Sequence, residues 1–280
     1  MTRRLVSLLA VSAVLIAACS GGSAATPGLS DPRAILTGST ASLQGLKSVH
    51  FKVAVAGSIN AGALTGGSDS SPDPNASPTL LDLSGTTIEG DVDLADSSGQ
   101  VAVSVPALLA FTANLVEVGG VAYVKTSLGD SKYAKLDLGA LTSGLPIPSL
   151  PALGSPDPSA AASMLATVNA ELATLPAPTK LADETVNGQD CYHVQEVVTP
   201  ADVPQASGAL DGISGTLTVD LWTQKADLRP SRLVIVVDGG SQGKLTLTVD
   251  LTNYDAAVTI AVPPADQISD QPFSLPGLTP

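Results

Sequence analysis

Stretches in which apolar and polar side chains alternate recur along this chain, and they constrain its fold more than any other feature. The first is residues 49–56, where Val49, Phe51, Val53 and Val55 alternate with small or polar residues. Because successive side chains of a strand point to opposite sides of a sheet, this pattern predicts a strand with one buried side. Further segments of this kind are 86–94, 100–105, 111–118, 121–126, 131–138, 180–186, 189–198, 215–224, 229–238, 244–254 and 258–261.

Short turns join many of these segments. Gly119-Gly120 separates two of them by two residues, and Asn187-Gly188 is the strongest two-residue hairpin signal in the chain. Gly129 and Asp130 mark another turn. Consecutive strands joined by such turns predict an antiparallel sheet.

Two Asp-Pro pairs predict helix starts, with Asp as N-cap and Pro in the first turn. One helix is expected from Asp31 to near 45–48, a second over 159–174, and 200–210 could form a short third. The fold class is therefore α+β. We expect a curved antiparallel half-barrel of about ten strands, covered on one face by about two or three helices.

The Gly- and Pro-rich stretches 61–78 and 141–158 are predicted to be an exposed loop and a segment without regular structure. The chain from Pro263 onward is expected to be loosely attached, because it is also rich in Pro. The predicted organisation is a signal peptide at 1–18, a tether at 19–30, one domain at 31–266 and a Pro-rich tail at 267–280.

The amino terminus is typical of an export signal. Arg3 and Arg4 precede an apolar stretch over 5–16 that is too short for a stable membrane-spanning helix. Residues 15–19, Leu-Ile-Ala-Ala-Cys, resemble the bacterial lipobox, which implies that Cys19 becomes the acylated first residue of the mature chain and carries fatty acids such as palmitate. The alternative is an ordinary secretory signal in which Cys19 has no role.

These features predict a protein held on the extracytoplasmic face of the cell membrane by a lipid on Cys19. Residues 20–30 are small and polar, as expected of a flexible tether. Removing the signal leaves 11 basic and 26 acidic residues, a net charge of −15. That charge argues against binding nucleic acid and against electrostatic docking on anionic lipid.

The sequence carries few groups for catalysis, and we expect no enzyme activity, no cofactor and no metal site. His50 and His193 are its only histidines, and no Ser-hydrolase, zinc-protease or phosphate-loop motif is present. Cys191 and His193 lie two residues apart and could supply two zinc ligands. We favour the simpler interpretation of a strand-borne Cys191, buried rather than reactive, with His193 in solvent or in a turn.

Glu89, Asp91 and Asp93 alternate along one strand, so their carboxylates share one face. Paired carboxylates can hydrolyse glycosides, but like charges at this spacing are more typical of a solvated outer face. Aromatics make up only 3% of the chain, so a stacking platform for sugars is hard to build.

A sheet face of Val, Leu, Ala and Gly with few large rings need not fill the space beneath covering helices. The hollow that remains would be apolar and nearly uncharged, which suits acyl chains. The alternative is a core of small residues that is packed solid.

Five segments, in the same order, resemble the LppX/LprG lipoproteins of mycobacteria and related bacteria. They are 46–51, 116–124, 186–190, 221–224 and 247–264, and the resemblance spans about 31 to 266. It implies a half-barrel like that of the LolA/LolB carriers and an apolar cavity for the acyl chains of a glycolipid or phospholipid. It also implies lipid transport across the cell envelope, with a membrane transporter as a loading partner.

Carried over by position, Val101 is the leading cavity-wall candidate. The weaker candidates are Val103, Val116, Val118, Ala122 and Val124. The long stretches 61–78 and 141–158 and the extra tail depart from the family pattern, which puts the cavity entrance and the ligand size in doubt. The competing function is an anchored structural or interaction module with a solid core and no ligand.

Overall fold

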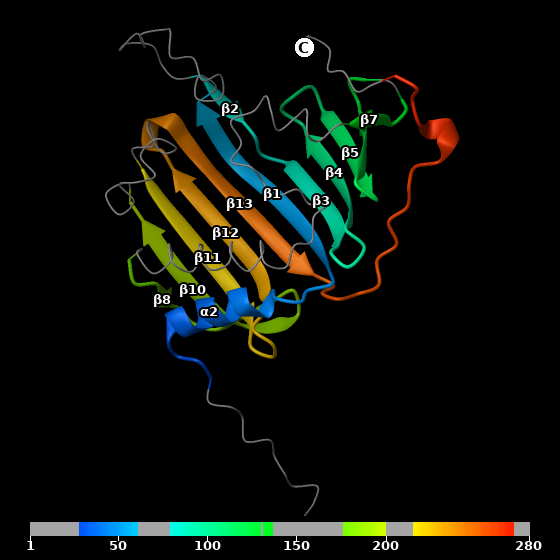
Figure 1. Ribbon diagram of the computed structural model, residues 1–280. Helices are drawn as coiled ribbons and strands as arrows, with labels where there is room; N and C mark the ends of the chain where they lie inside the picture. Colours follow the sequence, from blue (N-terminus) through cyan, green and yellow to red (C-terminus); the bar gives the residue numbers. More distant parts are fainter. Residues whose placement is uncertain (1–27, 61–78, 130, 137–175, 200–214, 272–280) are drawn as a thin grey trace, which may run out of the picture.

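A computed structural model of the chain describes residues 28–60, 79–129, 131–136, 176–199 and 215–271. Within these residues thirteen strands form one antiparallel sheet, ordered β7-β6-β5-β4-β3-β1-β13-β12-β11-β10-β8. The short strand β2 pairs with β1, and β9 pairs with β10. Figure 1 shows that the sheet is curved, with helix α2 at one end of the strands. The predicted α+β class and curved antiparallel sheet are therefore confirmed.

The strands of the first half are β1 (Ser48–Asn60), β2 (Leu80–Asp82), β3 (Thr86–Asp93), β4 (Ser98–Val105), β5 (Phe111–Val118), β6 (Val121–Thr126) and β7 (Ala134–Leu136). The strands of the second half are β8 (Thr179–Lys180), β9 (Glu184–Val186), β10 (Gln189–Val198), β11 (Thr216–Gln224), β12 (Pro230–Asp238) and β13 (Gly243–Thr252). Two 3-10 turns, η3 (Gly240–Gln242) and η4 (Ala265–Gln267), complete the described elements.

The predicted strands match most closely where glycine turns delimit them. β5, β6 and β10 have the bounds that the sequence predicts. Gly119 and Gly120, between β5 and β6, have φ angles of +60° and +76°, which glycine adopts at little cost. The segment predicted as one strand over 180–186 is divided into β8 and β9, which pair with different parts of β10.

The predicted strand at 258–261 is wrong, because these residues have no strand conformation and pair with no strand among the described residues. β13 already has β1 on one side and β12 on the other, so the chain that leaves it finds no free edge there. The chain instead turns away through Asn253 and Asp255, whose φ angles are +52° and +56°. Figure 1 shows this segment running along the molecule to η4, near β7.

Residues 267–269 pair with Tyr133, so the expectation of loose attachment from Pro263 onward is wrong for them. The N–H of Tyr133 donates to the carbonyl of Gln267, and the N–H of Ser269 donates to the carbonyl of Tyr133, both at 2.7 Å. Ile268 forms the bridge itself. The segment therefore closes against the β7 edge of the sheet.

The first predicted helix is confirmed as α2 (Pro32–Ser42), with Asp31 as N-cap accepting the N–H of Arg33. It ends earlier than predicted, because a turn after Ser42 draws the last N–H groups to nearer carbonyls, such as Gln44 to Ala41 at 3.1 Å. The predicted helices at 159–174 and 200–210, the stretches 61–78 and 141–158, and the signal with Cys19 lie outside the described residues. No helix among the described residues is long and apolar enough to cross a membrane.

Helix α2 packs on one side of the sheet at its β10 end. Ile35 of the helix forms a buried cluster with Tyr192 and Val194 of β10. Leu29, Leu36 and Leu228 pack around this cluster. Burying an aliphatic side chain contributes about 1.5–3 kcal/mol, so this cluster holds the helix to the sheet.

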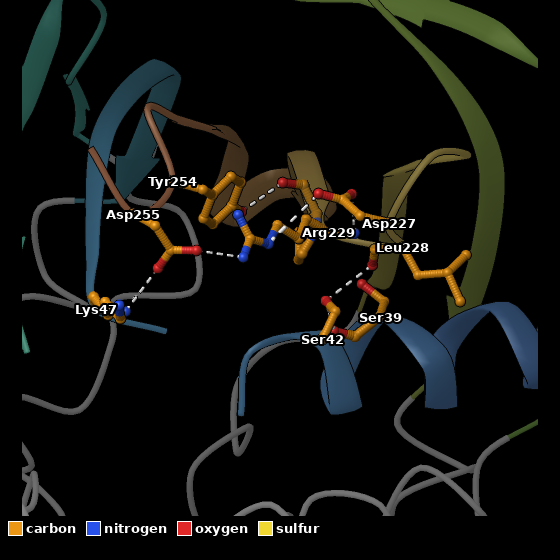
Figure 2. A network of polar contacts seen from close by, with 9 residues as sticks. Ser39, Ser42, Lys47, Asp227, Leu228, Arg229, Tyr254 and Asp255 are labelled. Carbon is orange, nitrogen blue, oxygen red and sulfur yellow. Dashed lines mark hydrogen bonds and ion pairs between the residues drawn. The ribbon is translucent and has the colours of Figure 1, made fainter. Parts of the chain in front are cut away.

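A polar network beside α2 joins three turns (Figure 2). The Arg229 guanidinium binds the Asp255 carboxylate, which also accepts the Lys47 N–H at 2.8 Å. The Tyr254 hydroxyl donates to the carbonyl of Pro230. Ser42 of the helix donates to the carbonyl of Leu228 at 3.0 Å. The exit of β13, the start of β1 and the β11–β12 turn are thereby fixed to one another.

Candidate functional site: the apolar face of the sheet

The register of the strands divides the sheet into two chemically different faces. Residues directly opposite each other on neighbouring strands share a face, and the faces alternate along each strand. Val53 lies opposite Val249 of β13 on one side and Ile88 of β3 on the other. Ile88 lies opposite Val103 of β4, so one face is apolar across four strands.

This apolar face continues to both ends of the sheet. Besides Phe51, Val53 and Val55 of β1, it comprises Ile88, Val101, Val103, Leu115, Val124, Leu247, Val249, Leu251, Leu233, Ile235, Val237, Leu217, Val219, Leu221, Val194 and Val198. Val194 belongs to the cluster beneath α2, so the helix covers this face at the β10 end.

The ring of Phe51 occupies the space opposite a glycine near the middle of the apolar face. Phe51 pairs with Gly90, which pairs with Val101 of β4. A Cβ added at Gly90 would lie 3.0 Å from the end of the Phe51 ring. The missing side chain at Gly90 therefore leaves room for the Phe51 ring on this part of the face.

The opposite face is polar, and its charges are paired across strands. The Asp91 carboxylate contacts Nδ1 of His50 at 2.8 Å and accepts the Gln100 amide at 2.9 Å. Lys52 lies 3.5 Å from Glu89. The pKa of Asp91 is lowered: burial acts to raise it, but the hydrogen bonds from Gln100 and His50 together outweigh that effect. The predicted alignment of Glu89 and Asp91 on one strand face is thus correct, with Lys52 opposite Glu89 and His50 opposite Asp91.

The six predicted cavity-wall residues divide between these two faces. Val101, Val103, Ala122 and Val124 lie on the apolar face, where Ala122 is 1% and Val124 8% exposed. Val116 pairs with Gln100, and Val118 pairs with Val121 on that same side. Val116 and Val118 therefore lie on the opposite face of the sheet from the other four candidates.

The alternation of apolar and polar residues along β5 is the sequence pattern that places Val116 on the polar face. Phe111, Ala113 and Leu115 alternate with Thr112 and Asn114, so the next position in the polar series is residue 116. Val116 is apolar, but it follows two polar residues in register. Alternation counted along the whole strand therefore assigns it to the polar face.

A cavity of about 610 Å³ lies over β3, β4 and β5. Three of the six predicted wall residues, Val101, Val103 and Val116, line it. Residues of the polar face predominate in its lining, among them His50, Glu89, Gln100 and Asn114. It is therefore not the expected apolar cavity. What the described residues provide for acyl chains is the extended apolar face on the other side of the sheet.

Two carboxylates lie on the apolar face, and sequence reasoning missed both. Glu117 of β5, opposite Ala122 of β6, is 5% exposed. Glu196 lies between Val194 and Val198 on β10, opposite Val219, and is 8% exposed. Its Oε1 atom has no hydrogen-bond partner among the described residues. Burial raises the pKa of Glu196, and the positive charge of Arg33 opposes this in part. The alternation Val-x-Glu-x-Val in the sequence is the signal that places it on this face.

Replacing Glu196 by Gln is expected to stabilise the protein at neutral pH by ~1 kcal/mol, because burying an ion costs more than burying an amide. The pKa of Glu196 in the folded protein lies above the ordinary value of 4.5. The carboxyl group's contribution to folding stability is therefore most favourable below pH 4.5, and it is lost as the pH rises through the folded-state pKa. Thermal melts of both proteins should coincide near pH 4 and diverge as pH rises. Glu89→Gln, an exposed control, should show no such gain, and parallel curves for Glu196→Gln would contradict the account.

The second histidine is buried, contrary to the expectation of a solvent or turn position. His193 is 7% exposed on β10, contacts Asp220 through Nε2 at 2.8 Å and stacks on Trp222 at 4.1 Å. The Trp222 indole N–H donates to Glu184 at 3.0 Å. These side chains contact one another on the polar face, while Nδ1 of His193 has no hydrogen-bond partner among the described residues.

Cys191 is fully buried, as predicted, and burial raises the pKa of its thiol. A thiol with a raised pKa is a poor nucleophile and a poor metal ligand near neutral pH. Within the described part of the chain, no group of three or more His, Cys, Asp or Glu side chains is arranged to hold a metal ion.

Comparison with known proteins places this geometry in context. The family model described as LppX_LprAFG lipoprotein matches residues 31–260. The crystal structure of LprF from Mycobacterium bovis is 18% identical, with a TM-score of 0.49, covering 83% of this chain and 96% of that one. The crystal structure of Mycobacterium tuberculosis lipoprotein LppX is 14% identical, with a TM-score of 0.48, covering 82% of this chain and 98% of that one. No curated protein sequence matches.

Proposed function

Because this chain belongs to the LppX_LprAFG lipoprotein family, we propose that it carries lipid by binding acyl chains against the apolar face of its sheet. The observation that carries the proposal is the register, which gathers valines and leucines of β1, β3, β4 and β10–β13 on one side. Acyl chains need contact area and no directional partner, which such a face supplies.

The side chains of this face are half-buried, which favours a ligand-binding surface over a fully packed core. Phe51, Val53, Val55, Val101 and Val103 are each of intermediate exposure. A protein does not usually leave a large continuous apolar face uncovered unless it binds something there. A glycolipid or phospholipid would lay its chains along the strands and leave its headgroup at the margin.

Anchoring through Cys19 completes the proposal. An acylated amino terminus would hold the carrier at the extracytoplasmic face of the membrane from which it collects lipid, and a membrane transporter there could load it. The lipid would then move outward across the cell envelope while the protein stays tethered by residues 19–30.

Native mass spectrometry of residues 20–280 tests the binding step. The purified protein is expected to carry a co-purifying lipid, seen as a mass excess that is lost on extraction with organic solvent. The lipid-free state should then take up added phospholipid. A protein that purifies without lipid and takes up none would favour the alternative of a solid structural module.

A further inference from the structure

Three leucines stand exposed where β4 turns into β5 and where β6 turns toward β7. Leu109 is 92% exposed, and Leu108 and Leu128 are each 51% exposed. The two turns are joined, because the N–H of Ser127 donates to the carbonyl of Thr112 at 2.8 Å and the Thr112 N–H donates to the Ser127 hydroxyl at 2.9 Å. We call the surface formed by these three leucines the apex.

The backbone at the apex is held in an unusual conformation. Leu109 and Ala110 both have φ angles of +55°, in the left-handed region that bulky side chains avoid. The turn is fixed by the Ala110 N–H donating to the Pro106 carbonyl at 3.1 Å and the Phe111 N–H donating to the Leu108 carbonyl at 3.0 Å. Strain of this kind persists where the surrounding structure enforces it, often at binding surfaces. Its effect here is to present Leu109 to the outside.

The chemistry of the apex fits a neutral lipid surface. Residues 105–112 and 126–129 contain no charged side chain, so attraction to anionic groups has no basis there. A stable protein partner would need about 800 Å² of matching surface on each side, more than three leucines on two narrow turns provide. Protruding apolar side chains on a turn can instead enter the boundary between headgroups and acyl chains.

The apex lies at the opposite end of the strands from Leu29, near which the described chain begins (Figure 1). Leu29 donates its N–H to the Tyr192 hydroxyl at 3.0 Å, so the chain is fixed from that residue beside α2. Figure 1 shows α2 at the lower end of the sheet and the β4–β5 turn at the upper end. The eight residues of β4 alone span ~26 Å at 3.3 Å each, so at least this length of sheet lies between the two ends of the strands.

We propose that the apex docks on a second lipid surface, facing away from the membrane that would hold the anchor, by inserting Leu108 and Leu109 among neutral lipids. This goes beyond acyl-chain binding, which uses the apolar face of the sheet. Docking and anchoring at opposite ends would let one protein contact two lipid layers.

Flotation of residues 20–280 with phosphatidylcholine vesicles tests the proposal. The protein is expected to float with the vesicles, and Leu109→Asp should lower the partition coefficient by about tenfold or more, because a charged group must enter the interface. Leu94→Asp is the matched control: Leu94 is a 41% exposed leucine at the other end of β3, and its replacement should change nothing.

A fluorophore attached to Leu109→Cys locates the contact, since the remaining thiol, Cys191, is buried. Its emission should shift to the blue on adding vesicles, and a fluorophore on Leu94→Cys should not respond. No flotation, equal flotation of both Asp variants, or binding that requires anionic lipid and disappears in salt would overturn the proposal. Lipid content of Leu109→Asp, read by native mass spectrometry, should equal that of the unmodified protein, so failure of docking leaves acyl-chain binding standing.

Discussion

Residues 20–280, exported behind a signal that ends in an ordinary Ala-x-Ala cleavage site, are expected to enter the aqueous phase of a detergent partition. The native chain should enter the detergent phase, with at least about a tenfold difference in distribution. Each buried methylene of an acyl chain contributes about 0.8 kcal/mol to membrane binding, so a diacylglyceryl group on Cys19 dominates all other contacts. The net charge of −15 expected once the signal is removed would offer no electrostatic substitute on anionic lipid.

The matched control keeps the native signal and changes Cys19→Ser. This chain should keep its full precursor mass, because the lipid-modified Cys is what marks the cleavage position in a lipobox. Reversible contact through the apex is too weak to survive detergent partition, so it does not confuse the result. Recovery of residues 20–280 in the detergent phase would contradict the anchor.

The hairpin turn at Asn187-Gly188 and the helix cap at Asp31 are predicted correctly from the sequence. Asn187 and Gly188, with φ angles of +52° and +77°, join β9 to β10 where the dipeptide indicates a hairpin. Asp31 caps α2 as its side chain predicts. These features depend on a few neighbouring residues, and local chemistry decides them.

The wrong predictions concern features that depend on contacts between residues far apart in the sequence. The alternation at 258–261 is typical of a strand, but pairing requires a free edge, and β1 and β12 already occupy both sides of β13. Tyr133 and Ile268 meet across 135 positions, which no local pattern indicates. The order of strands in a sheet is a long-range property, so period-two patterns predict strands without predicting their neighbours.

In the candidate site, too, local patterns and contacts between strands differ in what they reveal. The resemblance groups Val101, Val103 and Val116 as candidates by their position along the chain. The register separates them, because Val101 and Val103 lie on the apolar face and Val116 pairs with Gln100 on the polar face. The burial of His193 depends on Trp222 and Asp220 of the next strand, so the sequence of β10 alone could not reveal it.

The placement of Val101 and Val116 on opposite faces gives the most direct test of the central claim, that acyl chains bind the apolar face. Val101→Trp places a large ring where the chains would lie, beside Phe51 and Gly90. Val116→Trp adds the same ring on the neighbouring strand, on the polar face. Both valines are of intermediate exposure, so either ring can be accommodated by the fold.

The measurement is lipid occupancy by native mass spectrometry, with a thermal melt of each variant to confirm folding. Val101→Trp is expected to lower the bound lipid about tenfold, equivalent to ~1.4 kcal/mol of lost affinity, whereas Val116→Trp should retain it in full. Full occupancy in a folded Val101→Trp protein, or loss of lipid from Val116→Trp alone, would contradict binding on the apolar face.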